Sequence, residues 1–265
     1  VENGPKQGVE TICESFTHIL SIRYIYTEKS GLSNARNIGV NSNISDFIVF
    51  FDNDMKFNSG TLLAYDMVFH DYGDNYFYGG PVLADYEVPP PSWLIDFLPW
   101  SAKGHSLGEN IKVIDDALFL GGNFAISSKL FEEIGVFDNN CADGNAGLIG
   151  EETRLQRRLL SAGYKGVYSP GAVVHHWVPQ DRCSIKWTLQ RNYRAGLTLG
   201  KELILTLPKN YCSIMKVPCY LIKDYLFTLT SYCRLKLLFK PEQETFYLRF
   251  HMNFIKGQIY SVLND

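Results

Sequence analysis

The 265-residue sequence predicts an α/β fold with a mainly parallel, mixed sheet flanked by helices. Apolar segments of strand length alternate with helix-period segments over residues 1–200, which is typical of strands joined by crossover helices. A net charge of −3 at pH 7 and 46% hydrophobic residues are typical of a globular domain. A nucleic-acid binder would normally carry a dominant basic face, so we expect no nucleic-acid partner.

The elements of the first half follow from turn residues and periodicity. The segments with a clear pattern are a helix over residues 6–16, a strand over 19–26, a short helix within 30–43, a strand over 46–51 and a helix over 58–70. Prolines 89–91 predict irregular structure in residues 88–100. The large apolar side chains of that segment suit either a loop packed on the core or part of a substrate channel.

The second half begins with the same alternation and then becomes helical. The predicted elements are a glycine-broken strand over 115–128, a helix over 129–135, a polar loop over 137–150, a helix over 151–163 and a strand over 165–179. Gly163 is the expected C-cap of the helix before it. From Ser184 onward the pattern is mostly helical, with breaks at Pro208, Pro218 and Pro241.

The charge distribution separates two parts, which we expect to be an α/β domain over residues 1–200 and a helical segment over 201–265. The helical segment holds nine Lys and Arg against five Asp and Glu, whereas the other 16 basic and 23 acidic residues give the larger part a net −7. An apolar and basic mixture is typical of helices at a membrane interface. We therefore expect a cytoplasmic protein whose C-terminal helices either lie at the inner face of the cell membrane or pack on their own domain.

Six cysteines without C-x-x-C spacing indicate neither a zinc site nor a disulfide framework, and a reduced compartment is the simplest interpretation. No signal peptide opens the sequence, and no apolar run reaches the roughly 18 residues that span a bilayer.

Four polar clusters could carry chemistry. They are Asp52 with Asp54, Glu151 with Glu152, His175 with His176, and the loop 33–37. Carboxylates after a buried strand lie where open α/β sheets bind ligands, and Mg²⁺ and Mn²⁺ prefer such oxygen ligands. Three of the clusters also have a plain explanation: a solvated turn for the aspartates, a favourable helix dipole for the glutamates, and a structural role for the histidines.

Two enzyme classes place Asp-x-Asp after a strand. Phosphatases of the haloacid-dehalogenase type need Thr or Val two residues after the second Asp, where this chain has Lys56. This alternative is therefore the weaker one.

Five segments taken together resemble the family-two glycosyltransferases with the Rossmann-like GT-A fold. They read "GLSNARNIG", "FIVFFDND", "LGGNFAISSKLFEEIGVFD", "GEETRLQRRLLSAGY" and "YSPGAVVHHWVPQDR" and cover roughly residues 1–200. The resemblance implies inverting transfer of a sugar from a UDP-, dTDP- or GDP-sugar to a glycan or lipid-linked acceptor, with Mn²⁺ or Mg²⁺. Family members normally begin with one further strand and helix, so we expect this chain to lack them.

The resemblance also implies a role for each matching residue. Asp54 would bind the metal and the donor diphosphate, and Asp52 would lie near the donor ribose or the metal. Asn34 and Arg36 fall in the segment that approaches the nucleotide, and Glu2 stands where an Asp contacts the base.

Further roles concern the metal, the base and the acceptor. His176 would join the metal site, with His175 as its less favoured neighbour. Glu152 would be the general base, with Glu151 as the alternative. The acceptor-side candidates are Trp93, Asn123 and Trp177. A catalytically inactive nucleotide-sugar binder or a membrane-associated scaffold remains the competing hypothesis, favoured if changes at Glu152 and Asp54 leave transfer unaffected.

Overall fold

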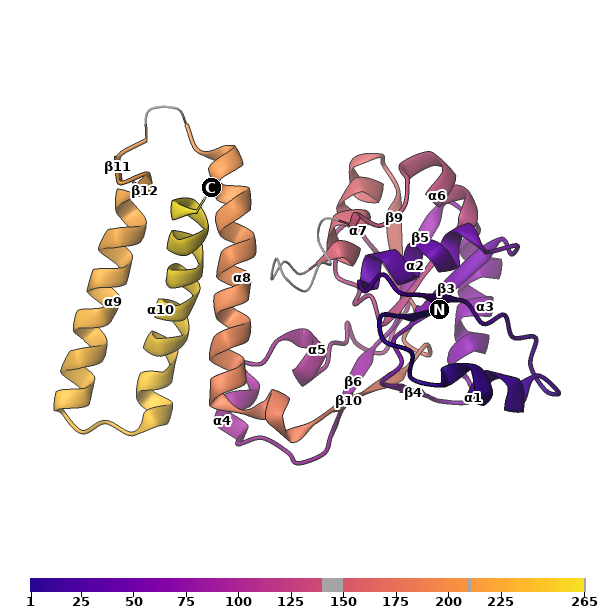
Figure 1. Cartoon of the computed structure of the whole chain (residues 1–265), viewed down its shortest axis with the longest axis horizontal. Coiled ribbons are helices and arrows are strands. Elements are labelled where there is room, and N and C mark those ends of the chain that lie inside the picture. The colour runs from indigo at the N-terminus through magenta and orange to yellow at the C-terminus, as the bar shows by residue number, and fades with distance from the viewer. Residues whose placement is uncertain (140–149, 209–210, 265) are drawn as a thin grey trace. The chain divides into compact units, whose positions relative to one another are not determined.

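A computed structural model describes residues 1–139, 150–208 and 211–264, which form two compact units (Figure 1). The described part of the first unit is residues 1–83, 105–139 and 150–175, and that of the second is residues 84–104, 176–208 and 211–264. The chain passes between the units within strands β6 (Val82–Tyr86) and β10 (Val174–Val178). The packing therefore divides the chain elsewhere than at the boundary of residue 200 expected from charge.

The first unit is built on a five-stranded mixed sheet, which confirms the predicted α/β class. Its strands, in spatial order, are β3 (Phe47–Phe51), β8 (Asn123–Ser127), β5 (Tyr76–Gly79), β9 (Lys165–Tyr168) and β7 (Lys112–Ile114). Strands β3, β5 and β9 run in one direction, whereas β8 and β7 run in the other. Because β8 lies between β3 and β5, only β5 and β9 pair in parallel within this sheet.

Helices cover both faces of this sheet because its strands alternate in the direction of their side chains. Phe124 and Ile126 of β8 pack in a cluster with Leu155 of helix α7 (Glu151–Ser161), whereas Ala125 packs in another with Tyr65 of helix α3 (Thr61–Tyr72). The other elements of this unit are α1 (Val9–Phe16), α2 (Leu32–Asn41), α6 (Ser128–Ile134), β1 (Glu2–Asn3), β2 (Tyr26–Thr27) and β4 (Met55–Phe57).

Several expected elements differ from the structure. The strand expected over residues 19–26 is wrong, since only Tyr26 of that stretch lies in a strand. The segment expected to be irregular contains two short helices, α4 (Ser92–Ile95) and α5 (Trp100–Lys103), and each follows a proline directly. Proline suits a helix start because its fixed φ is already helical and its missing N–H is not needed there. The loop expected over 137–150 falls mostly outside the described residues.

The second unit is helical beyond residue 184. Helices α8 (Ile185–Thr206), α9 (Cys219–Leu237) and α10 (Glu242–Leu263) are separated at Pro208, Pro218 and Pro241, as predicted. Helix α10 packs along both α8 and α9 (Figure 1). The α8–α10 contact is close: a Cβ at Gly196 would lie 2.1 Å from the Phe254 carbonyl oxygen. A four-residue 3₁₀ helix, Gln180–Cys183, precedes α8.

A disulfide joins Cys212 and Cys219, so the expectation of no disulfide is wrong at this pair. The hairpin of β11 (Ser213–Ile214) and β12 (Val217–Pro218) brings their Cα atoms to 5.6 Å. Spacing in the sequence could not show this, because the two cysteines meet only once the hairpin forms. Within the described residues, none of the helices combines the length and apolar character that crossing a membrane requires.

Candidate active site

The two aspartates lie in the turn that follows β3. Phe51, the last residue of β3, pairs with Asn123 at the start of β8, and the backbone N–H of Met55 donates to the Asp52 carbonyl at 3.2 Å. Asp52 and Asp54 are both half-buried. The buried strand thus ends at a turn with two carboxylates at the sheet edge, as the sequence predicts.

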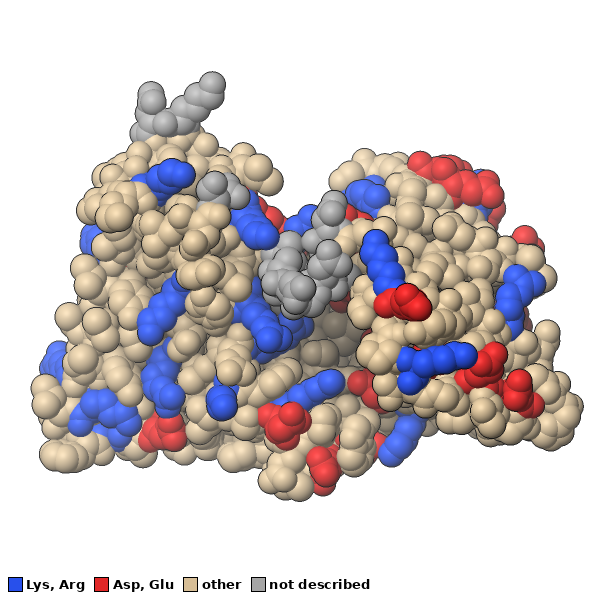
Figure 2. All heavy atoms as spheres, in the orientation of Figure 1, with Lys and Arg blue, Asp and Glu red and all other residues tan. Residues whose placement is uncertain are grey.

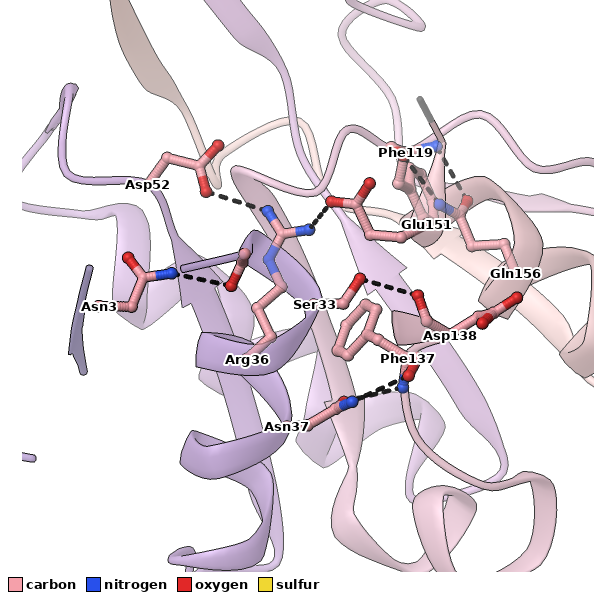
Figure 3. Close-up of polar contacts among 11 residues, drawn as sticks. Asn3, Ser33, Arg36, Asn37, Asp52, Phe119, Phe137, Asp138, Glu151 and Gln156 are labelled. Atoms are coloured by element: carbon pink, nitrogen blue, oxygen red, sulfur yellow. Dashed lines mark hydrogen bonds and ion pairs between the residues drawn. The ribbon is translucent and has the colours of Figure 1, made fainter. Parts of the chain in front are cut away.

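Arg36 of α2 joins two of the predicted motifs (Figure 3). Its Nη2 donates to Asp52 Oδ1 at 3.0 Å, and its Nη1 donates to Glu151 Oε1 at 2.7 Å. Only 7% of Arg36 is exposed, so water weakens these ion pairs little. The planar guanidinium holds the two carboxylates in one place because its N–H groups point in fixed directions.

Two adjacent glycines allow this ion-pair network to lie against the backbone. A Cβ at Gly121 would come within 2.6 Å of Arg36 Nη1, and one at Gly122 within 2.8 Å of Asp52 Oδ2. Both distances are too short for a side-chain carbon. Sequence analysis assigned these glycines only a strand break; the Gly-Gly pair directly before a buried strand was the available signal.

The two adjacent glutamates at the start of α7 differ in environment. Glu151 is buried and paired with Arg36. Burial, and next the negative charge of Glu151, raise the pKa of Glu152 to about 7, and the opposing effect of Arg36 is smaller. A carboxyl with a pKa near 7 exchanges protons readily at neutral pH. The geometry therefore distinguishes a structural glutamate from one suited to acid–base chemistry.

Polar contacts fix α2 and α7 around this network (Figure 3). The Asn37 side chain donates to the Phe137 carbonyl at 2.8 Å and accepts from the Phe137 N–H at 2.9 Å. The Gln156 amide makes the corresponding pair of bonds with the backbone of Phe119, at 2.8 and 3.0 Å. Asn37 lies in the polar cluster 33–37 noted in the sequence, whereas nothing in the sequence pointed to Gln156. The partners of both residues lie far away along the chain.

The residues expected at the nucleotide are not all in one cluster. Asn34 donates to the Lys29 carbonyl at 3.0 Å and is not among the residues that Arg36 contacts. Glu2 accepts hydrogen bonds from the Tyr24 hydroxyl and the Gln7 N–H, and these bonds lower its pKa. The donor-binding roles of Asn34 and Glu2 stay predictions.

Asn123 is completely buried and its amide is fully engaged. It accepts from the Tyr65 hydroxyl at 2.8 Å and donates to the carbonyls of Pro81 and Ala172 at 3.1 and 2.7 Å. These bonds fix the start of β8 to neighbouring backbone. Its acceptor role stays a prediction that this placement does not favour, because a ligand would have to displace satisfied internal bonds.

The remaining candidates lie around strand β10 and in the second unit. His175 belongs to the first unit, whereas His176 and Trp177, both in β10, belong to the second. Trp177 is 38% exposed, and Trp93 packs edge-on against Phe246. Their expected roles, in the metal site for His176 and toward the acceptor for the tryptophans, stay predictions.

The donor set after β3 suits a hard divalent cation. Among the described residues no group of three or more His, Cys, Asp and Glu side chains could hold a metal ion. Asp52 and Asp54 nevertheless supply carboxylate oxygens from one turn. Mg²⁺ commonly binds one or two carboxylates and completes its coordination with substrate phosphates and water.

The second unit contains a cavity of about 350 Å³. Its wall combines the aromatic rings of Phe97, Trp100 and Phe250 with the polar side chains of Arg191 and Asn192. Aromatic faces beside hydrogen-bonding groups are suited to small ligands that have both apolar and polar surfaces.

Comparison with known proteins identifies the family. The model of glycosyl transferase family 2 matches residues 1–135. The succinoglycan biosynthesis protein ExoM of Rhizobium meliloti (strain 1021) is 30% identical over 191 residues, which are 69% of this chain and 56% of ExoM. The chain thus spans little more than half the length of this curated relative.

Three solved structures are similar at low sequence identity. GalNAc-T7 with UDP, GalNAc and Mn²⁺ has a TM-score of 0.49 at 13% identity, covering 78% of this chain and 44% of that one. TarS 1–349 of S. aureus has a TM-score of 0.48 at 10% identity, covering 96% of this chain and 77% of that one. The mannosyltransferase PcManGT of Pyrobaculum calidifontis, with GDP-Man and Mn²⁺, has a TM-score of 0.47 at 14% identity, covering 98% of this chain and 62% of that one. At these TM-scores no residue role follows from them.

The family match includes both Arg36 and the turn with Asp52 and Asp54, and it extends over half of the chain. The protein therefore belongs to glycosyl transferase family 2.

Proposed function

We propose that this protein is an inverting glycosyltransferase that moves a sugar from a nucleotide-diphosphate sugar to an acceptor hydroxyl, in the synthesis of a surface polysaccharide or glycan. One observation carries the proposal: Arg36 unites the Asp52 turn and the Glu151–Glu152 helix start in one site. That site combines carboxylates for a donor with a carboxyl whose pKa of about 7 suits a base. Membership of glycosyl transferase family 2 and similarity to the succinoglycan biosynthesis protein ExoM support it.

Glu152 is the general base of the proposed reaction. Its ionised carboxylate accepts the proton of the acceptor hydroxyl while the hydroxyl oxygen bonds to the anomeric carbon. The bond from that carbon to the diphosphate oxygen breaks, and the electron pair leaves with the diphosphate. General-base help of this kind typically contributes about 10²–10⁴-fold in rate.

Glu151 and Arg36 act on this base indirectly. The buried ion pair holds Glu151 at 2.7 Å from the guanidinium, and the charge of Glu151 raises the pKa of the neighbouring Glu152 side chain. Together with burial, this charge gives Glu152 a pKa of about 7, which suits a general base at neutral pH.

Asp54 and Asp52 are the residues that would hold Mn²⁺ or Mg²⁺, with Asp54 as the main ligand and His176 as a further candidate. When bound, the metal would neutralise charge on the departing diphosphate. Asp52 is already oriented by Arg36, so the donor side of the site is preorganised. The donor is a UDP-, dTDP- or GDP-sugar.

The acceptor is a glycan or a lipid-linked sugar. Sugar rings present apolar faces and hydroxyl edges, which match the aromatic rings and polar side chains of the cavity around Trp100. We include the cavity in the proposal as a binding site of the second unit for an acceptor sugar, together with the sequence candidates Trp93 and Trp177. A lipid-linked acceptor also requires peripheral contact with a membrane.

The decisive experiment separates transfer from donor binding. Calorimetric titration of UDP, dTDP and GDP, with and without Mn²⁺, identifies the nucleotide. Glu152→Gln should then bind that nucleotide normally but lose release of nucleoside diphosphate from its sugar. Asp54→Ala should lose the Mn²⁺-dependent part of the affinity. If both variants retain full turnover, the base and metal assignments fail; if the wild type binds a nucleotide but never turns over its sugar, the non-catalytic binder replaces the enzyme.

A further inference from the structure

Helix α9 is the outer helix of the second unit and leaves one long face uncovered. It packs on α10 (Figure 1), and its buried Leu221 lies in one apolar cluster with Ile255 and Val262 of α10. The exposed apolar residues of α9 are Tyr220, Leu226, Phe227 and Leu237, which are 53%, 53%, 72% and 79% exposed. At about 100° per residue they fall within roughly one third of the helix circumference, and the exposed Lys223 and Arg234 fall in the same sector. Isolated exposed apolar residues are ordinary, but a row of four along one helix face is not.

Exposed apolar residues also extend beyond both ends of α9. Before the helix, Met215 is 81% exposed at the tip of the β11–β12 hairpin. After the helix, Phe239 is 94% exposed in the turn to α10. Both have positive φ values, 50° and 55°, which are unfavourable for residues other than glycine. The Cys212–Cys219 disulfide closes the first of these turns.

The charge of this region has one dominant sign. Residues 211–240 contain five basic residues, Lys216, Lys223, Arg234, Lys236 and Lys240, and one acidic residue, Asp224. Asp224 is directed toward α10, where it lies 2.9 Å from the His251 ring. The net charge of +4 over 30 residues contrasts with −3 for the whole chain. Lys and Arg also predominate over Asp and Glu on the side of the helical unit visible in Figure 2.

We propose that the outer face of α9, with its two flanking turns, lies flat on an anionic lipid bilayer. The apolar side chains would enter the headgroup boundary while the basic side chains pair with lipid phosphates. Charged residues within α9, such as Lys223 and Arg234, favour a helix that lies on the membrane rather than one that crosses it. The pairing of two such faces in a symmetric dimer is disfavoured because both are positive.

This surface deepens the membrane contact proposed above, but it does not depend on glycosyl transfer. Each basic residue near an anionic membrane raises its partition about fivefold, so Lys223 and Arg234 together contribute about 25-fold. Burial of an exposed Phe adds a contribution that salt does not remove.

Co-sedimentation of the full chain with vesicles tests the proposal, using phosphatidylcholine alone and a 7:3 mixture with phosphatidylglycerol. We expect binding to the mixture only, weakened by high salt. Lys223→Glu with Arg234→Glu should abolish it, and Phe227→Ser should weaken it about tenfold or more. Tyr247→Ser, on the exposed side of α10, is the matched control and should bind as the wild type does. Circular dichroism melting identifies any variant that fails to fold.

Three results would overturn the proposal: no binding of the wild type to the anionic vesicles, equal binding to both vesicle types, or full binding by the folded Lys223→Glu, Arg234→Glu variant. Light scattering without lipid tests the alternative that a second copy of the chain binds this face. A dimer that Phe227→Ser converts to monomer would assign the face to self-association instead. Nucleotide titration of the same variants should be unchanged, so this test and the test of transfer fail independently.

Discussion

Glu152→Gln should change stability and activity in opposite directions. The side chain remains similar in size but can no longer ionise. In the wild type, the pKa of Glu152 rises from an ordinary 4.5 to about 7, mainly through burial and next through Glu151. The folded chain thus binds this proton more tightly than the unfolded chain, and stability falls as pH rises through the window between these two values.

The magnitude follows from the width of that window. Integration from pH 5 to pH 8 gives a loss of about 2–3 kcal/mol from this group in the wild type, and Glu152→Gln removes it. The same titration leaves about one tenth of Glu152 ionised at pH 6 and about nine tenths at pH 8. The turnover rate should therefore rise nearly tenfold over this range.

Urea denaturation at pH 5 and pH 8 measures the stability effect without a substrate. Glu152→Gln should lose less stability than the wild type between these pH values, while turnover falls about 10²–10⁴-fold. Glu151→Gln is the matched control: it leaves the buried Arg36 with one partner fewer and should destabilise the fold at both pH values. Identical pH dependence of stability in the wild type and Glu152→Gln, or a flat wild-type rate from pH 6 to pH 8, would refute the reasoning.

Three other changes probe the remaining parts of the site. Arg36→Lys keeps the charge but cannot hold both carboxylates, so we expect the free energy of unfolding measured with urea to fall by about 2 kcal/mol. An unchanged denaturation midpoint would contradict the role of the planar guanidinium. Gly122→Ala places a methyl group against Asp52 and should weaken the donor affinity measured by calorimetry about tenfold, whereas Gly60→Ala, which faces open space, should not change it. Equal affinities of the two variants would contradict a role of Gly122 in shaping the donor site. Trp100→Ala should raise the KM for the acceptor and leave that for the nucleotide sugar unchanged, and the reverse pattern would exclude the cavity as an acceptor subsite.

Local patterns were sufficient for much of the fold. The strand before Asp52, the helix that begins at Glu151 and the helix breaks at three prolines all depend on neighbours within a few residues. The predicted secondary structure was wrong where it depends on contacts between segments far apart in the chain. The segment over 19–26 alternates like a strand, yet only Tyr26 pairs with the parallel partner that makes one. Strand partners lie far away along the chain, so alternation alone could not supply them.

The sequence by itself determined which chemical groups the candidate site contains: two aspartates after an apolar strand, two glutamates at a helix start and an arginine in the segment 33–37. That segment was expected to be a polar loop or part of a short helix, and the structure places it in helix α2. Only the tertiary structure decided which of these groups contact one another and which are buried. Arg36 and Glu151 are 115 residues apart, and their ion pair distinguishes one glutamate from its neighbour. Asn123 is likewise buried, and its side-chain amide makes hydrogen bonds within the protein. Residue type is local information, whereas pKa and exposure depend on which distant segments the fold brings together.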